Sequence, residues 1–321
     1  MTNKLIIPIL IVIAVLALTL PFYFDTYLLH IVTTILIYMA LSLSWDMMLR
    51  TGQLSFGTAG FFGLGAYASV ILTVDFGVHP LISLLLGGIF SALIAFFLGF
   101  AVLKLREIYF AIVTLALTHV FSVVIRNIPS LTGGPSGRLL ASSIFGGDPA
   151  KTYWLVLVVA IVVILLSELF RRSRIHFAIS SIRNDEITAR SSGIDVFKYL
   201  LFVFVLTSAI QGVIGAVYAQ QYAFVNPETT FSLDFLLLPI AIALVGGIYS
   251  TIGPIIGAFL LGFVSEYLKL VMPYGHLIVY GIIIVIIVLF LPQGLYKPIA
   301  GKIATLRENN IGSDKNAQSG S

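Results

Sequence analysis

Residues 80–103 read PLISLLLGGIFSALIAFFLGFAVL and contain no charged side chain. A helix of this length is long enough to cross the hydrocarbon core of a bilayer, which needs roughly 20 apolar residues. The leucines and isoleucines fall on all faces of such a helix and do not alternate with polar residues, as they would in a strand of a membrane barrel. The stretch therefore predicts a transmembrane helix.

The rest of the chain has the same character. Its 321 residues have a mean hydropathy of +1.07 and are 59% hydrophobic and only 10% charged, whereas soluble domains carry about 25% charged residues. A water-soluble fold is excluded because too much apolar surface would remain exposed. Nucleic acid is not an expected partner, since the chain has no basic polar region with interleaved aromatic residues. The expected surroundings are the lipid bilayer.

Ten apolar runs are bounded by charges or by Pro and Gly clusters. We therefore expect an all-α fold, a polytopic membrane helical bundle of about ten transmembrane helices, within residues 1–306. The polar residues 307–321 are expected to form a disordered cytoplasmic tail. The ten runs cover residues 5–22, 28–49, 56–74, 80–103, 109–125, 153–170, 199–220, 232–249, 252–271 and 276–291.

The distribution of basic residues predicts the orientation of the bundle. If the amino terminus is cytoplasmic, 14 of the 18 lysine and arginine residues fall on the cytoplasmic side. Lysine and arginine are enriched in cytoplasmic loops of membrane proteins. We therefore expect both termini in the cytoplasm, with four basic residues on the external side: Arg126, Arg138, Lys151 and Lys269.

The polar residues do not form the pattern of an enzyme or of an ion-coupled transporter. The chain has no cysteine, and its five histidines are isolated in the sequence, so we expect no catalytic residues, no metal site and no cofactor. Two pairs of opposite charges are interpreted as local ion pairs within helices, namely Asp46 with Arg50 and Glu266 with Lys269. Asp234 is interpreted as a carboxylate at a helix start. Since no GxxxxGK[ST] loop occurs, any ATP that drives transport must be hydrolysed by another subunit.

The longest charged segment between two spans is residues 171–198. Within it, residues 171–193 are predicted to form one short amphipathic helix that ends at Gly193. A helix of this kind docks into a groove of a cytosolic partner, lies on lipid headgroups or forms a solvated loop. Its predicted apolar side comprises Ile175, Phe177, Ile179, Ile182 and Ile187, and its charged side comprises Arg183, Asp185, Glu186 and Arg190.

Glycines punctuate the start of the third run, at Gly52, Gly57, Gly60, Gly63 and Gly65. One interpretation is an interrupted helix that exposes backbone groups to a polar pathway, and the other is close packing of helices on small residues. A similar element follows later in the chain. The motif Gly-x-x-Ser occurs at residues 52–55 and again at 247–250, each time after a span that ends on the cytoplasmic side. This repetition suggests that the chain consists of two related halves.

Several of these motifs, in this order, resemble the permease subunits of bacterial ATP-binding-cassette (ABC) importers for branched-chain amino acids. The resemblance covers most of the chain. It is carried by Gly52-Gln-Leu-Ser-Phe-Gly57, Phe61-Phe-Gly-Leu-Gly-Ala-Tyr67, Ile182-Arg-Asn-Asp-Glu-Ile-Thr-Ala-Arg190, Asn226-Pro-Glu228 and Val245-Gly-Gly-Ile-Tyr-Ser-Thr-Ile-Gly-Pro254.

The resemblance implies a transporter subunit of the bacterial cytoplasmic (inner) membrane rather than an enzyme. Its implied partners are a second, homologous permease, two cytosolic ATP-binding subunits and an external substrate-binding protein. Taken with the glycine clusters, it implies that the translocation path includes Gly52, Ser55, Phe56, Gly57, Thr58, Gly60, Gly63, Gly65, Gly247 and Ser250. The implied contact with the ATPase comprises Arg183, Asn184, Asp185, Glu186, Arg190 and Gly193.

The implied cargo is a branched-chain or other hydrophobic amino acid. Related permeases carry urea or short amides, and Thr58 stands where the family often has histidine. The nearly uncharged spans suit a cargo without net charge. An ATP-independent transporter or channel, and more remotely a membrane enzyme, remain as alternatives.

Overall fold

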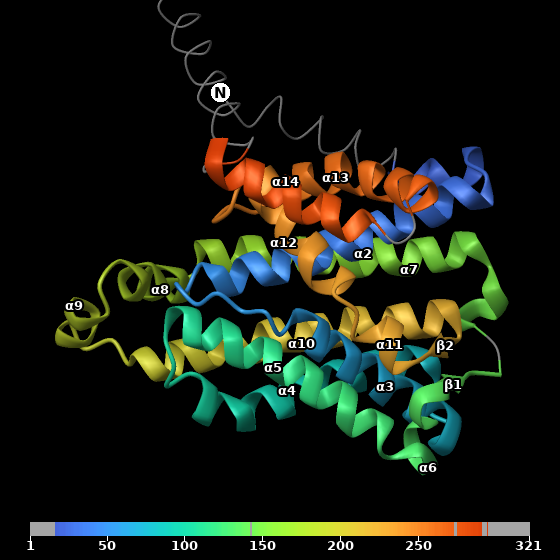
Figure 1. Cartoon of the computed structure of the whole chain (residues 1–321), viewed down its shortest axis with the longest axis horizontal. Helices are drawn as coiled ribbons and strands as arrows, with labels where there is room; N and C mark the ends of the chain where they lie inside the picture. The colour runs from blue at the N-terminus through green and yellow to red at the C-terminus, as the bar shows by residue number, and fades with distance from the viewer. Residues whose placement is uncertain (1–16, 142, 273–274, 291–293, 295–321) are drawn as a thin grey trace, which may run out of the picture.

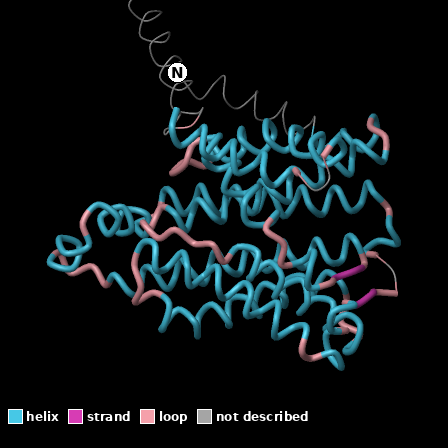
Figure 2. Tube along the Cα trace, viewed as in Figure 1, coloured by secondary structure: helices cyan, strands magenta, loops and turns pink. Residues whose placement is uncertain are grey.

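The computed structural model describes residues 17–141, 143–272, 275–290 and 294. They form a helical bundle whose long helices run roughly along one axis of the molecule (Figure 1). Among these residues strand is confined to two short segments at one end, as Figure 2 shows. The predicted all-α bundle is confirmed.

Eight helical segments in the described part of the chain are long and apolar enough to cross a membrane. A shorter apolar helix, α14 (His276–Phe290), follows them. Most of the first predicted span, residues 5–22, lies outside the described residues, as does the predicted tail 307–321. The number of ten spans therefore stays a prediction. The eight segments are α2 (Thr26–Leu49), α3 (Thr58–Phe76), α4 (Pro80–Val102), α5 (Glu107–Arg126), α7 (Pro149–Arg172), α10 (Val196–Tyr222), the stretch of α11 (Pro227–Thr230) and α12 (Asp234–Gly246), and α13 (Ile252–Val271).

Helix α2 forms the centre of the bundle. Nearly all of its residues from Ile35 to Met48 are buried, and it contacts α7, α10, α12 and α13. By contrast, α4 exposes large apolar side chains such as Leu85 and Phe97, which lipid or another apolar surface would cover. The bundle thus has a buried central helix and apolar outer faces.

Helices α3, α4 and α10 pack with their backbones close together. A Cβ added at Gly65 would overlap the backbone of Gly212, and one added at Gly215 would overlap the carbonyl of Phe62. Only glycine permits an approach this close. Gly65 therefore has a packing role, which was one of the two interpretations of the glycine cluster.

The two ends of the bundle differ. At one end, α8 (Arg174–Asn184) and α9 (Glu186–Ser191) project beyond the long helices (Figure 1). At the other end, β1 (Arg138–Leu139) pairs antiparallel with β2 (Phe224–Val225) among the short segments α6 (Pro129–Thr132), η1 (Gly134–Ser136) and η2 (Ile144–Gly147). A salt bridge of 2.6 Å between Arg138 and Asp75 ties this end to α3. We refer to these as the α8–α9 end and the β1–β2 end.

Candidate functional site

The α8–α9 end contains two short helices rather than the single helix predicted for residues 171–193. The chain breaks at Asp185, whose backbone is extended (φ −158°, ψ 109°). Its carboxylate accepts hydrogen bonds from the Ile187 and Thr188 backbone N–H groups, at 2.9 and 3.2 Å, and from the Thr188 hydroxyl. These bonds hold the pKa of Asp185 below its usual value. The prediction of one helix was wrong because Asp185 acts as an N-cap and starts a second helix.

The break also divides the predicted apolar side. Ile179 and Ile182 are buried against the bundle, whereas Phe177 and Ile187 are 79% and 78% exposed. Phe177 lines a groove of about 360 Å³ together with Asn184 and Asp185. This end thus exposes two large apolar side chains beside charged ones.

Glu186 attaches α9 to Arg106, the N-cap residue of α5. Its carboxylate pairs with Arg106 at 2.9 Å and with Arg190 at 2.7 Å. Partial burial alone would raise the pKa of Glu186, but the two arginines outweigh this effect and hold it below its usual value. Gly193 has φ +81° and its N–H donates to the carbonyl of Arg190 at 3.0 Å, so the predicted helix end at Gly193 is confirmed.

A non-helical segment, residues 51–57, connects α2 to α3 and runs back into the bundle (Figure 2). The Trp45 indole N–H donates to the carbonyl of Ser55 at 2.8 Å, and the Phe56 N–H donates to the Thr114 hydroxyl at 2.9 Å. Irregular backbone at membrane depth is tolerated where protein surrounds it or where it lines a cavity. Irregular backbone thus lies around Gly57, between α2 and α3, whereas α3 itself is one continuous helix from Thr58 to Phe76.

The remaining glycines of the cluster lie inside the continuous helix α3. Gly60 faces Thr118 and Phe121 of α5, and Gly63 faces the ring of Phe231. Two polar atoms near the start of α3 are buried without a hydrogen-bond partner, namely Thr58 Oγ1 and Gln53 Oε1. The irregular backbone is therefore limited to the segment before α3, and one unsatisfied polar group lies in that segment and the other at the first residue of α3.

A buried ion pair lies at the α8–α9 end of α2. Asp46 and Arg50 are 2.7 Å apart and neither side chain has exposed surface. The local pairing predicted from the sequence is confirmed, but the pair also joins other helices. Arg50 donates to the Ser167 hydroxyl of α7 at 3.3 Å, and Asp46 accepts the backbone N–H of Tyr249 at 2.6 Å.

Tyr249 belongs to the turn between α12 and α13, which contains the second Gly-x-x-Ser motif. Gly247 has φ +121° and Tyr249 has φ +62°. The Ser250 hydroxyl closes the turn, because it donates to the Gly247 carbonyl and accepts the Gly253 N–H, both at 2.9 Å. The two Gly-x-x-Ser motifs therefore lie at the same end of the bundle.

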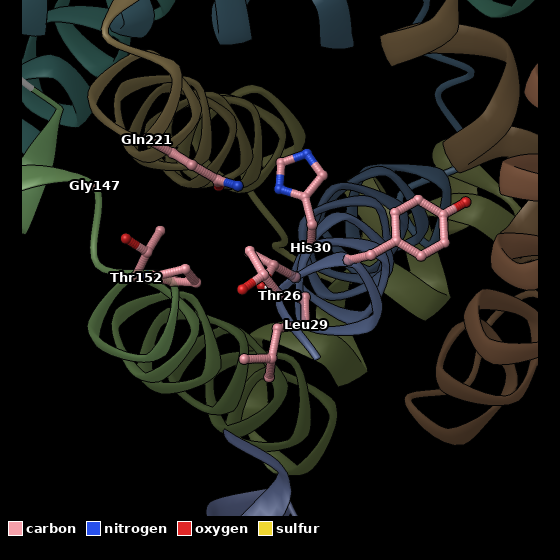
Figure 3. Close-up of a pocket in the computed structure, with 9 residues that line it drawn as sticks. Thr26, Leu29, His30, Gly147, Thr152 and Gln221 are labelled. Atoms are coloured by element: carbon pink, nitrogen blue, oxygen red, sulfur yellow. Dashed lines mark hydrogen bonds between the residues drawn. The ribbon is translucent and has the colours of Figure 1, made fainter. Parts of the chain in front are cut away.

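The β1–β2 end contains a pocket of about 520 Å³ between α2, α7 and α10. Figure 3 shows His30 and Gln221 extending into this space, with Thr152 on the opposite side. His30 lies 3.0 Å from the Tyr222 hydroxyl. In the sequence His30 is isolated, because its neighbours in the fold come from helices that are distant along the chain. No cluster of metal-ligating side chains occurs among the described residues.

Two further predictions concern this end. Lys269 and Glu266 form the expected ion pair at 2.9 Å, and α12 begins at Asp234. Lys269 also lies 5.1 Å from the centre of the Tyr38 ring. That contact between α13 and α2 could not be seen in the sequence.

Comparison with known proteins identifies similar chains. The profile of the family described as "Branched-chain amino acid transport system / permease component" matches residues 27–288. The high-affinity branched-chain amino acid transport system permease protein LivM of Escherichia coli is 29% identical over 316 residues, which cover 89% of this chain and 74% of that protein. LivM of Salmonella typhimurium is 30% identical over 91% of this chain and 75% of its own length. The probable permease LivH of Methanocaldococcus jannaschii is 25% identical over 81% of this chain and 86% of its own length.

Proposed function

The chain belongs to the family of branched-chain amino acid transport system permease components, and from this membership we propose that it is the transmembrane permease subunit of an ATP-driven ABC importer for branched-chain amino acids. The observation that carries the proposal is the family match over residues 27–288. This range takes in α2 to α13, including α8 and α9. The family consists of transporter subunits, so the chain is not an enzyme.

We propose that the α8–α9 end faces the cytoplasm of a bacterium. Nine lysine and arginine residues of the described part of the chain belong to this end, whereas four belong to the β1–β2 end. This asymmetry agrees with the enrichment of basic residues in cytoplasmic loops. The four at the opposite end are Arg126, Arg138, Lys151 and Lys269.

The ATP-binding subunits are proposed to dock on α8 and α9. Exposure supports this assignment, because Phe177 and Ile187 project away from the bundle and Asn184, Asp185, Arg190 and Gly193 are exposed beside them. Arg183 and Glu186 are half-buried and lie between this surface and the membrane helices. The element can therefore contact a cytosolic protein on one side and the bundle on the other.

The translocation path is proposed to run along residues 51–57 and the start of α3. Support comes from the buried irregular backbone and from the unsatisfied polar atoms of Thr58 and Gln53. Transporters use interrupted helices of this kind to present backbone groups to their cargo. The proposed path begins with Gly52, Ser55, Phe56, Gly57 and Thr58, and continues along α3 with Gly60, Gly63 and Gly65. It also includes Gly247 and Ser250 of the second Gly-x-x-Ser motif.

The proposed assembly contains a second permease and an external substrate-binding protein. The similarity of this chain to both LivM and LivH proteins supports a homologous partner, and the exposed apolar faces of α4 and α5 offer surface for one. The binding protein is proposed to dock at the β1–β2 end. Selectivity would then reside largely in that protein, because the described spans carry few charges.

Affinity purification from gently solubilised membranes, followed by uptake assays in proteoliposomes, tests this function. We expect ATPase subunits and a second permease to copurify, and the reassembled complex to take up leucine only with ATP and the binding protein. Uptake of urea or acetamide in place of leucine would support the alternative cargo. Uptake by the chain alone without ATP would contradict the importer and support a secondary transporter or channel.

A further inference from the structure

The side chain of Arg183 spans the distance between α8 and both Gly-x-x-Ser motifs. Its Cγ lies 3.3 Å from the position that a Cβ of Gly52 would occupy. Its guanidinium carbon lies 4.3 Å from the centre of the Tyr249 ring, within cation–π distance. One arginine of α8 therefore contacts the turn after α2 and the turn after α12.

Tyr249 connects this contact to the buried ion pair. Its φ of +62° is uncommon for a residue other than glycine, so the surrounding contacts must hold it. The main one is the 2.6 Å bond from its N–H to Asp46, which in turn pairs with Arg50. A displacement of Arg183 would thus reach α2 through Tyr249 and Asp46.

The other contacts of α8 with the bundle are of a different kind. They include Ile179 and Ile182, which are buried apolar side chains and make non-directional contacts. Three polar atoms near this contact are buried without hydrogen-bond partners: Nη1 of Arg183, Nη1 of Arg50 and Oε1 of Gln53. Unused donors and an unused acceptor are thus available for a second arrangement of the same side chains.

We propose that Arg183 and Tyr249 form the directional link through which movement of α8 is transmitted to α2 and to the α12–α13 turn. The inference rests on the proposed function, since it assigns positioning roles within an ATP-driven importer. Tyr249 was not among the residues that the sequence singled out. Neither residue is proposed to bind the cargo.

The test uses the complete importer in proteoliposomes and measures the ATP hydrolysed per leucine taken up. In Tyr249→Asn the ring is lost, while asparagine tolerates positive φ. Tyr249→Phe keeps the ring and is the conservative control. Arg183→Met keeps an apolar stem over Gly52 without the charge, and Arg172→Met is the matched control at an exposed arginine.

We expect Tyr249→Asn and Arg183→Met each to raise the ATP used per leucine about two- to fivefold, the change that corresponds to losing one cation–π contact near the surface. Tyr249→Phe and Arg172→Met should leave the ratio unchanged. Since the two residues act as one link, the double variant should be no worse than either single variant. A purely structural role would lower the yield of the complex without changing this ratio.

An unchanged ratio in Tyr249→Asn would overturn the inference, as would effects that multiply in the double variant. Arg183→Met could also prevent binding of the ATPase subunits. In that case the inference is tested by comparing Tyr249→Asn with Tyr249→Phe, because Tyr249 lies on the membrane bundle rather than on α8 or α9. A wild-type complex without ATP-driven uptake would instead contradict the proposed function, and this result is obtained before any variant is compared.

Discussion

Replacement of Asp46 by leucine should strongly destabilise the protein. Arg50 has no exposed side-chain surface, and without Asp46 the only hydrogen-bond partner it keeps among those described above is the Ser167 hydroxyl at 3.3 Å. Removing one member of a buried ion pair costs about 3–5 kcal/mol, because the other charge stays buried without compensation. At roughly 2–4 °C per kcal/mol, the thermal midpoint should fall by about 6–20 °C.

Thermal unfolding of the detergent-solubilised chain, followed by tryptophan fluorescence, measures this effect. Trp45 is a suitable reporter because it is buried and donates to Ser55 close to the ion pair. Glu168→Leu is the matched control, since its partners Arg171 and Arg172 are largely exposed and such pairs contribute under about 1 kcal/mol.

The double variant Asp46→Leu with Arg50→Met should recover most of the loss, because an apolar pair of similar size replaces a buried ion pair at little cost. A midpoint for Asp46→Leu within about 2 °C of the wild type would refute the reasoning, given the shift expected per kcal/mol. A double variant less stable than both single variants would refute it as well, since it would mean that the charges do not compensate each other.

Three further predictions concern other parts of the fold. Gly65→Ala should lower the free energy of unfolding by about 1–3 kcal/mol because its methyl group would overlap the backbone of α10, whereas Gly281→Ala meets no atom within 4 Å and should not be destabilising in the same thermal assay. Arg106→Glu or Glu186→Arg alone should speed hydrogen exchange of α9, and the combined charge swap should restore it; equal exchange in the single variants would contradict the role of this ion pair. Burial, followed by the charges of three nearby arginines, lowers the pKa of His176. The unfolded chain therefore binds the proton more readily, and stability should fall as the pH drops below about 6.5. This pH dependence should disappear in His176→Phe, and a thermal midpoint equally dependent on pH in that variant would contradict the assignment.

The sequence was a sufficient guide to the features that depend on neighbouring residues. Apolar length predicted the long helices, since the bilayer requires each span to satisfy its backbone hydrogen bonds internally. The Glu266–Lys269 pair and the helix end at Gly193 were also predicted, because each involves residues within one turn. One local prediction was nevertheless wrong. The periodicity of residues 171–193 favoured a single helix, but the side chain of Asp185 caps a second helix and so interrupts the first.

By itself, the sequence determined that this protein is an apolar helical bundle with one charged element between two spans. Only the tertiary structure decided which polar groups meet. Asp46 and Tyr249 are 203 positions apart in the sequence, and Gly65 faces Gly212 rather than a cavity. Such contacts depend on how whole helices pack, and the periodicity of one helix specifies which face is apolar without specifying the helix that covers it.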